Sequence, residues 1–475
     1  MFAKVQRIHF VGIGGIGMSG IAEVLQNLGY PVSGSDLKTS AVTQRLAAMG
    51  VRIFEGHQAG NVPGAEVVVT SSAIARNNPE VVEAARLHIP VIQRAEMLAE
   101  LMRLKYGIAI AGMHGKTTTT SMVAAVLAAG GLDPTVVVGG RVDAMGSNAR
   151  LGKSQYLVAE ADESDRSFLK LSPILSVVTN IDREHMDCYR DMADVENTFV
   201  EFMDRVPFYG MIVACGDDAM LRSLLPRVRR RVVTYGMRED SNFRVQVSSA
   251  PAQETIPMSP EGPLSRFQVV YRDKDLGEFH LHVPGQHNVL NATAAVAVGV
   301  GLDIPAEKIR EALLSFRGVD RRFQRKGVIR GVTVVDDYGH HPTEIRATLA
   351  AAKQAGFKRV HVIFQPHRYT RTQLLMDDFA TAFGDATSTC VLDIYAASEA
   401  PIPGITGEAL AQRIRARGND AAEYASSFPI AVASAVGAAQ SGDLILTLGA
   451  GSVVQIAPMV LEALQEGSNP SASKF

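Results

Sequence analysis

The 475-residue chain has no tryptophan and is poor in cysteine, with Cys188, Cys215 and Cys390 as its three thiols. These cysteines are scattered, odd in number and without C-x-x-C spacing, so no disulfide framework or zinc site is indicated and a reducing cytoplasm is favoured. The sequence also lacks an apolar run near the roughly 20 residues that span a bilayer. Glycines within its first apolar stretch disfavour a signal peptide. We therefore expect a cytoplasmic protein without membrane insertion.

A strong charge of one sign is missing as well. The formal net charge is −2, which gives no general attraction to nucleic acid or to an anionic membrane. With 47% hydrophobic and 20% charged residues, a chain of this length exceeds one hydrophobic core. It is expected to form two to four packed domains.

The most informative feature that is present is the stretch AGMHGKTTTT at residues 111–120, which follows an apolar strand predicted over 106–111. Its glycines allow backbone N–H groups to surround phosphate oxygens, Lys116 reaches β- and γ-phosphates, and the Thr117 hydroxyl is suited to Mg²⁺. The spacing is shorter than the common Gly-x4-Gly-Lys-[Ser/Thr], because Ile110 replaces the outer glycine. A helix is predicted over 121–129. An ordinary βα turn is the alternative to this ATP-binding interpretation.

The N-terminal region predicts a Rossmann-like βαβ unit, with a strand over 7–11, the turn GIGGIG at 12–17, a helix over 18–28 and a second strand ending at Asp36. Asp36 lies about 20 residues beyond the glycines, where a ribose hydroxyl is bound. A dehydrogenase is the alternative, but no His or Tyr constellation supports it. A nucleotide diphosphate without nicotinamide is therefore favoured. Ser71 and Ser72 follow another strand and suit a phosphate or sugar, or simply end the strand.

Acids and a histidine follow two further predicted strands, in EADESD at 160–165 and NIDREHMD at 180–187. In parallel sheets ligands lie outside the carboxyl ends of the strands, so these groups should converge with Lys116. A carboxylate completes a Mg²⁺ shell with Thr117. His185 is a candidate for a second metal, although imidazole is softer than Mg²⁺ prefers, and a structural histidine is the alternative.

The C-terminal part contains four apolar segments, at 332–336, 360–364, 389–393 and 444–448, which predict a third doubly wound sheet from about residue 318. Before it, PGQHNVLN at 284–291 enters a helix whose asparagines either cap it or bind adenine. The basic run 321–326 lies at a domain boundary, where a cation reaches the γ-phosphate only on closure. His340-His341 has no third ligand nearby and is not expected to hold metal.

These motifs resemble the Mur ligases, ATP-dependent amide-bond ligases of bacterial peptidoglycan precursor synthesis. The segments that carry the resemblance are 112–118, 160–163, Asn180 with 185–187, and 285–291. A second set, at 12–20, 34–36, 70–74, 147–150, 336–342 and 366–372, resembles the branch that adds L-alanine to UDP-N-acetylmuramate. A sister ligase that adds a peptide to the same sugar nucleotide is the alternative, and a nucleotide sensor without ligase activity is a more distant one.

The resemblance implies an α/β fold of three domains. A Rossmann-like UDP-sugar domain is expected over 1–105, a central P-loop ATPase domain with a mostly parallel sheet over 106–317, and a Rossmann-like domain that closes on ATP and amino acid over 318–475. The implied partners are UDP-N-acetylmuramate, L-alanine and ATP with two Mg²⁺ ions. We expect a monomer or a weak homodimer.

The resemblance also implies residue roles. ATP is expected at Gly112, Met113, His114, Gly115, Lys116, Thr117, Thr118, His287, Asn291, Arg322 and Asp337, and Mg²⁺ at Thr117, Glu160 and His185. The sugar nucleotide and amino acid are expected at Gly14, Gly15, Gly17, Ser19, Asp36, Ser71, Ser72, Asn148, Tyr338, His340, Arg368 and Arg371. The catalytic residues implied are Lys116, His185, Arg322 and Arg371.

Two departures from the family pattern bear on this expectation. Met113 occupies a place where the family usually has threonine, but the loop binds phosphate mainly through its backbone, so we expect binding to survive. Several sister ligases use a carbamylated lysine beyond the His-Met-Asp motif, and here no lysine lies between Lys170 and Lys274. That sister mechanism is not available to this chain.

Overall fold

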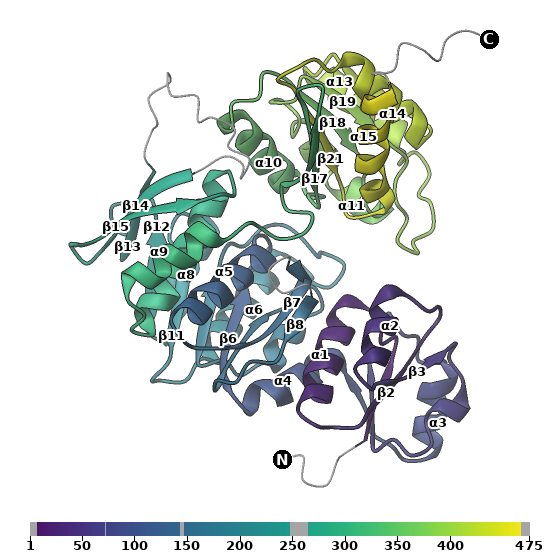
Figure 1. Ribbon diagram of the computed structural model, residues 1–475, viewed down its shortest axis with the longest axis vertical. Helices are drawn as coiled ribbons and strands as arrows, with labels where there is room; N and C mark the ends of the chain where they lie inside the picture. The colour runs from purple at the N-terminus through teal and green to yellow at the C-terminus, as the bar shows by residue number, and fades with distance from the viewer. Residues whose placement is uncertain (1–6, 72, 143–146, 248–264, 467–475) are drawn as a thin grey trace. The chain divides into compact units, whose positions relative to one another are not determined.

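The computed structural model describes residues 7–71, 73–142, 147–247 and 265–466, and leaves out the side chains of residues 16, 139–142, 147 and 148. Three β-sheets flanked by helices follow one another along the chain, from purple through teal to yellow (Figure 1). The chain divides into two compact units. One contains most of the residues up to Arg317, and the other contains most of the residues from Gly318 onward. The predicted three-domain α/β fold is confirmed, while its boundaries stay a prediction. Within the described ranges, no helix is both long and apolar enough to cross a membrane.

The first sheet has five parallel strands in the order β3-β2-β1-β4-β5. This is a doubly wound order that reverses between β1 and β4, and it confirms the Rossmann-like prediction. The 12–17 turn follows β1 at this reversal, where such sheets bind ligands. The strands are β1 Ile8–Val11, β2 Val32–Asp36, β3 Arg52–Glu55, β4 Val67–Thr70 and β5 Val91–Gln93, and the helices are α1 Ile16–Asn27, α2 Ala41–Ala48, α3 Pro79–Arg86 and α4 Arg94–Arg103.

The second sheet has ten strands in the order β15-β14-β13-β12-β11-β10-β6-β9-β7-β8. Strand β6 lies between β10 and β9 and pairs with both in parallel, so the carboxyl ends of these three strands meet at one edge. Strand β8 is antiparallel to β7. The strands are β6 Tyr106–Ala111, β7 Thr135–Val142, β8 Ser147–Arg150, β9 Tyr156–Glu160, β10 Leu175–Val178, β11 Met211–Cys215, β12 Val232–Gly236, β13 Phe243–Val247, β14 Ser265–Tyr271 and β15 Lys274–Leu281, and the helices are α5 Lys116–Ala129, α6 Met192–Asp204, α7 Ala219–Leu224, α8 Gln286–Gly301 and α9 Ala306–Ser315.

The third sheet has six strands in the order β16-β17-β21-β18-β19-β20, and β16 is antiparallel to β17. The four predicted strands are present, but both edge strands were missed. Strand β16 carries charged, exposed side chains typical of an edge, so its sequence was taken for a basic run, and β20 has three residues. The strands are β16 Gln324–Ile329, β17 Val332–Asp337, β18 Val360–Phe364, β19 Ser388–Val391, β20 Ala422–Tyr424 and β21 Leu444–Leu448, and the helices are α10 Pro342–Gln354, α11 Tyr369–Leu374, α12 Met376–Ala380, α13 Gly407–Ala416, α14 Phe428–Ala438 and α15 Ile456–Glu466.

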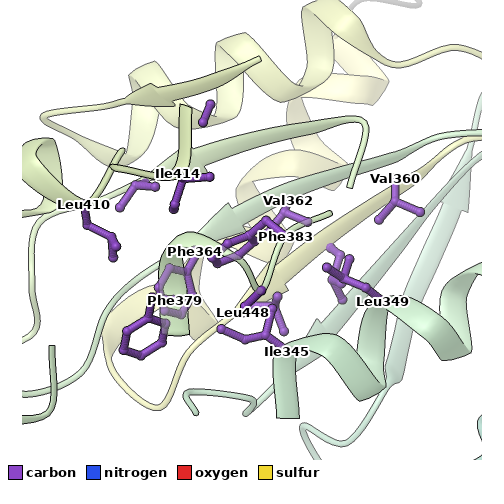
Figure 2. Packing of buried hydrophobic residues seen from close by; sticks show 14 of the residues in the cluster. Ile345, Leu349, Val360, Val362, Phe364, Phe379, Phe383, Leu410, Ile414 and Leu448 are labelled. Carbon is purple, nitrogen blue, oxygen red and sulfur yellow. The ribbon is translucent and has the colours of Figure 1, made fainter. Parts of the chain in front are cut away.

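A hydrophobic core fixes the third sheet against its helices. Figure 2 shows Phe364 and Val362 of β18 packed among Phe379, Phe383 and Leu410 from the helical side, all of them buried. Burying one such side chain contributes roughly 1.5–3 kcal/mol relative to leaving it in water. This rigid core holds the loops that follow β17, β18 and β19.

Candidate functional site

The glycine-rich loop 112–115, the predicted phosphate-binding loop, connects β6 to α5 at the edge where β9 and β10 also end. Gly112 and Gly115 have φ angles of +125° and +83°, a region that favours glycine. A Cβ on Gly112 would lie 2.0 Å from Oγ1 of Thr179, and a Cβ on Gly115 would lie 2.8 Å from Oδ1 of Asn291. Both glycines are therefore required by backbone conformation and by close neighbours.

Helix α5 begins at Lys116, directly after the loop, so the predicted start at Ser121 was wrong. The four threonines before Ser121 are β-branched and have modest helix propensity. Three of them, Thr118, Thr119 and Thr120, are buried, and tertiary packing outweighs that propensity. As a result the first N–H groups of α5 and its positive dipole end lie at the loop, where an anion is stabilised.

The residues after β10 hold the phosphate loop in place. Asn180 receives a hydrogen bond from the His114 N–H at 2.9 Å and donates from Nδ2 to the His114 carbonyl at 3.0 Å. The Asn180 carbonyl accepts from Met113 N at 3.2 Å, and the Met113 side chain is buried. Nε2 of His114 lies 2.9 Å from Oδ2 of Asp182. Sequence reasoning noted Asn180 in a motif but gave it no role, because its loop-bracing contact is not local in sequence.

Lys116 lies at the centre of a cluster of charged groups, in which Glu163 is buried and Lys116 half-buried. Its ammonium donates to the Gly112 carbonyl at 2.7 Å, to the Met113 carbonyl at 3.2 Å and to Oε1 of Glu163 at 2.7 Å. Burial by itself lowers the pKa of Lys116, but the Glu163 carboxylate outweighs this and raises it above the usual value. The lysine is therefore charged at neutral pH. Glu163 is a functional candidate that was not among the predicted site residues, although EADESD is a sequence signal for it.

Of the three predicted metal ligands, His185 contacts this cluster. Thr117 is in the first turn of α5, and Glu160 ends β9. Nε2 of His185 lies 3.5 Å from Oε1 of Glu163, and the His185 backbone has φ of +57°. Oε2 of Glu163 is buried without a hydrogen-bond partner in the described part of the chain. Hydroxyl and carboxylate oxygens are the ligands that Mg²⁺ prefers, so the Thr117, Glu160 and Glu163 oxygens fit this ion, whereas the His185 imidazole is a softer donor.

Two predicted adenine contacts, His287 and Asn291, lie one turn apart on α8. Asn291 is buried and close to Gly115. Burial, assisted by the Arg322 guanidinium, lowers the pKa of His287 to about 4, so its imidazole is neutral at pH 7. A neutral imidazole and a carboxamide each offer a donor and an acceptor, as adenine recognition requires. Asn288 instead donates to the Pro284 carbonyl at 2.7 Å and closes the turn before α8.

The first glycine loop is fixed by Asp36. Oδ2 of Asp36 accepts from the Gly14 N–H at 2.8 Å, and Oδ1 accepts from the Leu37 N–H at 2.8 Å. A Cβ on Gly14 would lie 2.8 Å from Oδ2 of Asp36, so glycine allows this approach. Asp36 thus stabilises the loop, a structural role that was not predicted from the sequence. The ribose contact stays a prediction.

The other predicted sugar-nucleotide residues differ in accessibility. Gly15 is exposed, and Gly17 is close to Arg94, with 3.0 Å between a Cβ built on Gly17 and Cδ of Arg94. Arg94, which was not predicted, pairs with Asp162 at 3.0 Å. Ser19 is buried on α1 and Ser71 is half-buried after β4, whereas Ser72 and the side chain of Asn148 lie outside the described residues.

The start of the third sheet arranges Arg322 and Asp337. The Asp337 carboxylate accepts from the Phe323 N–H at 2.6 Å and from the Gly339 N–H at 2.7 Å, and burial raises its pKa. Arg322 pairs with Glu344 at 3.3 Å, and its guanidinium lies 5.1 Å from the Tyr338 ring centroid. Asp337 therefore braces the backbone, and its predicted contact with ATP stays a prediction.

A row of rings lies at the carboxyl ends of β17, β18 and β19. Ring centroids are 5.4 Å apart from Tyr338 to His340, 5.9 Å from His340 to His367, and 5.5 Å from His367 to Tyr395. Burial, and then the neighbouring His340, Arg371 and Arg368, lowers the pKa of His367 to about 4. Nδ1 of the neutral ring is 3.2 Å from Nη1 of Arg371. His367 and Tyr395 were not among the predicted site residues, because stacking of these rings depends on the sheet.

The two histidines after β17 have different surroundings. His340 belongs to the ring row, and its backbone N–H donates to Oε2 of Glu344 at 3.0 Å. His341 is the N-cap of α10, where its Nδ1 accepts from the Thr343 N–H at 3.3 Å. The His341 ring thus stabilises a helix start within its unit.

Three family models match this chain in succession: "Mur ligase family, catalytic domain" over residues 7–106, "Mur ligase middle domain" over 110–299, and "Mur ligase, glutamate ligase domain" over 321–451. Among similar curated proteins, the UDP-N-acetylmuramate--L-alanine ligase of Koribacter versatilis is 71% identical and that of Acidobacterium capsulatum 65% identical. The matches cover 98% of this chain in both cases, and 98% and 99% of those proteins. The crystal structure of the UDP-N-acetylmuramate-alanine ligase of Thermotoga maritima is similar with a TM-score of 0.79 and 30% identity, over 97% of this chain and 99% of that one. The chain belongs to the Mur ligase family.

Proposed function

We propose that this chain is an ATP-dependent ligase that joins L-alanine to the carboxylate of UDP-N-acetylmuramate in peptidoglycan precursor synthesis. The products are UDP-N-acetylmuramoyl-L-alanine, ADP and phosphate. The observation that carries the proposal is full-length similarity, at 71% and 65% identity, to proteins named for this reaction. The Lys116 ammonium at the glycine-rich loop supports the proposal, because a cation there would stabilise the charge of the phosphates.

The proposed chemistry activates an unreactive carboxylate. An oxygen of the muramoyl carboxylate attacks the γ-phosphorus of ATP, and the bond from this phosphorus to the β,γ-bridging oxygen breaks. ADP leaves, and an acyl phosphate is formed. The neutral amine of L-alanine attacks the acyl carbon, phosphate leaves with the C–O bond pair, and the nitrogen loses a proton. Protein groups need only align the reactants, stabilise charge and exclude water.

In this proposal Lys116 and the first turn of α5 bind the β- and γ-phosphates, with Gly112, Met113, His114, Gly115, Thr117 and Thr118 around them. Thr117, Glu160 and His185 would hold two Mg²⁺ ions, which would supply charge neutralisation at the γ-phosphate. His287 and Asn291 bind adenine. The buried oxygen of Glu163 and the charged Lys116 favour a site for metal-bound phosphate.

The first glycine loop, with Gly14, Gly15, Gly17 and Asp36, is assigned to the sugar nucleotide. Arg322 and Asp337 are assigned to ATP, and Tyr338, His340, Arg368 and Arg371 to L-alanine and the muramoyl end. Closure of the third domain would bring these groups to the acyl phosphate and keep water away. We assign the enzyme to the cytoplasm, as a monomer or weak homodimer.

This function is tested by measuring phosphate release from ATP in the presence of Mg²⁺ and UDP-N-acetylmuramate, with and without L-alanine. We expect release that requires both substrates, and a sugar nucleotide heavier by one alanyl residue in mass spectrometry. Release only with a peptide would assign the chain to the sister branch. No release with either acceptor would contradict the ligase proposal.

A further inference from the structure

Glu399, a residue outside the predicted site, ties the loop after β19 to the turn that carries Arg368. Its Oε1 accepts from Nε of Arg368 at 2.5 Å and from Oγ1 of Thr370 at 2.6 Å, and its Oε2 accepts from the Thr370 N–H at 3.0 Å. The same two loops are joined where the Arg368 N–H donates to the Tyr395 carbonyl at 2.8 Å. One carboxylate therefore receives three hydrogen bonds from a single turn.

Both loops have unfavourable backbone conformations. Arg368 has φ of +74°, and the residues just before Glu399, Ala397 and Ser398, have φ of +47° and +72°. Non-glycine residues in this region cost free energy and persist only where surrounding contacts impose them, often at functional sites. The hydrogen bonds to Glu399, together with the one from the Arg368 N–H to the Tyr395 carbonyl, are among the contacts that hold this turn.

The charge of Glu399 matters as much as its position. Burial by itself raises the pKa of Glu399, but hydrogen bonds from Thr370 and Arg368 outweigh it and lower the pKa below the usual value. The carboxylate is therefore ionised at neutral pH. A charged partner holds the planar guanidinium of an arginine in one orientation, which a long free side chain does not maintain.

We propose that Glu399 is a positioning residue of the amino-acid site, which holds Arg368 in the orientation that binds the carboxylate of the amino-acid substrate. This inference rests on the proposed function, because Arg368 has that role only if an amino acid is the acceptor. Glu399 itself touches no reacting atom. Its contribution is to the affinity for L-alanine rather than to the chemistry at the γ-phosphate.

The variant Glu399→Gln tests the inference, because it keeps the shape and an acceptor oxygen and removes the charge. We expect KM for L-alanine to rise about tenfold, with KM for ATP and for UDP-N-acetylmuramate and kcat changed by less than about twofold. Thr370→Val removes one hydrogen bond to Glu399 but keeps the ion pair, and should change KM for L-alanine by less than about threefold. Glu399→Asp, which keeps the charge, should recover part of the lost affinity.

Asp443 offers a matched control in the same sheet. It precedes β21 at the amino ends of the strands and pairs with Arg359 at 2.6 Å. Asp443→Asn breaks an arginine–carboxylate ion pair like that of Arg368 and Glu399, but at the opposite end of the strands from the ring row. It should lower the melting temperature and leave KM for L-alanine unchanged.

Three outcomes would overturn the inference. An unchanged KM for L-alanine in an active Glu399→Gln protein would overturn the inference alone. A Glu399→Gln protein that only loses thermal stability, as Asp443→Asn is expected to, would show a purely structural role. A wild-type protein without L-alanine-dependent phosphate release would overturn the proposed function, and the inference with it.

Discussion

This chain has two glycine-rich turns, at residues 12–17 and 112–115. Each follows a central parallel strand and precedes a helix, but the charged side chains next to them differ. In the first turn, the Asp36 carboxylate accepts a hydrogen bond from the loop backbone. Gly15, the residue before α1, has a φ angle of −59°. In the second, Lys116 lies in the helix start and α5 follows Gly115 with φ of +83°. Both turns offer backbone N–H groups, but in the second a half-buried lysine directly follows the last glycine. We infer that each turn is suited to anion binding through its backbone, and that the neighbouring side chains decide whether a reaction is catalysed there.

Removing Mg²⁺ is the strongest test of this difference. Chelation with excess EDTA should abolish phosphate release, because the ions expected at Thr117, Glu160 and His185 would be lost. Binding of UDP to the first loop, measured by calorimetry, should change by less than about twofold, since we assign no metal there. Loss of UDP binding on chelation would contradict the separation of the two loops.

The variant Lys116→Ala should lower kcat by at least ~10³ with the fold intact, because it removes a cation that stabilises charge in the transition state. Phosphate release gives the rate, and circular dichroism with a melting curve reports the fold. Lys105→Ala is a control, since Lys105 precedes β6 and its ammonium donates to the Ser154 carbonyl at 2.6 Å. Near-normal turnover by Lys116→Ala would show that the phosphate-loop assignment is wrong.

Matched glycine variants sharpen the comparison. Gly112→Ala places a Cβ 2.0 Å from Oγ1 of Thr179 at φ of +125°, so we expect ATP affinity to fall about 100-fold. Gly14→Ala places a Cβ 2.8 Å from Oδ2 of Asp36, so this carboxylate must shift and its hydrogen bond from the Gly14 N–H weakens. We expect KM for UDP-N-acetylmuramate to rise about tenfold at most. Equal losses in the two variants would remove the distinction between a rigid and an adjustable turn.

Asp36→Asn tests whether the first loop needs its negative charge. The amide keeps one acceptor for the Gly14 N–H, so we expect KM for UDP-N-acetylmuramate to rise by roughly fivefold and KM for ATP to stay unchanged. Steady-state kinetics with each substrate varied in turn will measure both. A change in KM for ATP of the same size would mean that the two loops are coupled.

The smallest expected effect is that of alkaline pH on the second loop. The pKa of Lys116 is raised above 10.5, because its attraction to Glu163 outweighs the lowering by burial. Such a group contributes stability that is fully present below the unfolded pKa and is lost only as the pH rises through the higher folded value. Lys116 therefore stays charged between about pH 7 and 9. The affinity for ATP, measured by calorimetry, should stay constant within about twofold over this range. A steep loss over this range would contradict a charged, paired lysine.

Sequence patterns predicted the three sheets because their central strands are short apolar runs between turns. The edge strands β16 and β20 were missed since one is polar and the other has three residues. The start of α5 was placed late, at residue 121, although the buried Thr118, Thr119 and Thr120 already belong to the helix. Strand ends also indicated Glu160 and His185 as neighbours of the loop, since parallel strands meet at one edge.

The order of motifs along the chain by itself determined the family resemblance, the three-domain α/β class and the place of each glycine turn, because backbone conformation and hydrophobic pattern are local properties. Only the tertiary structure decided which carboxylate faces which cation. Lys116 and Glu163 are 47 residues apart in sequence, and Arg368 and Glu399 are 31 apart. Such pairs depend on strand order, and the free energy of a buried charge depends on everything packed around it.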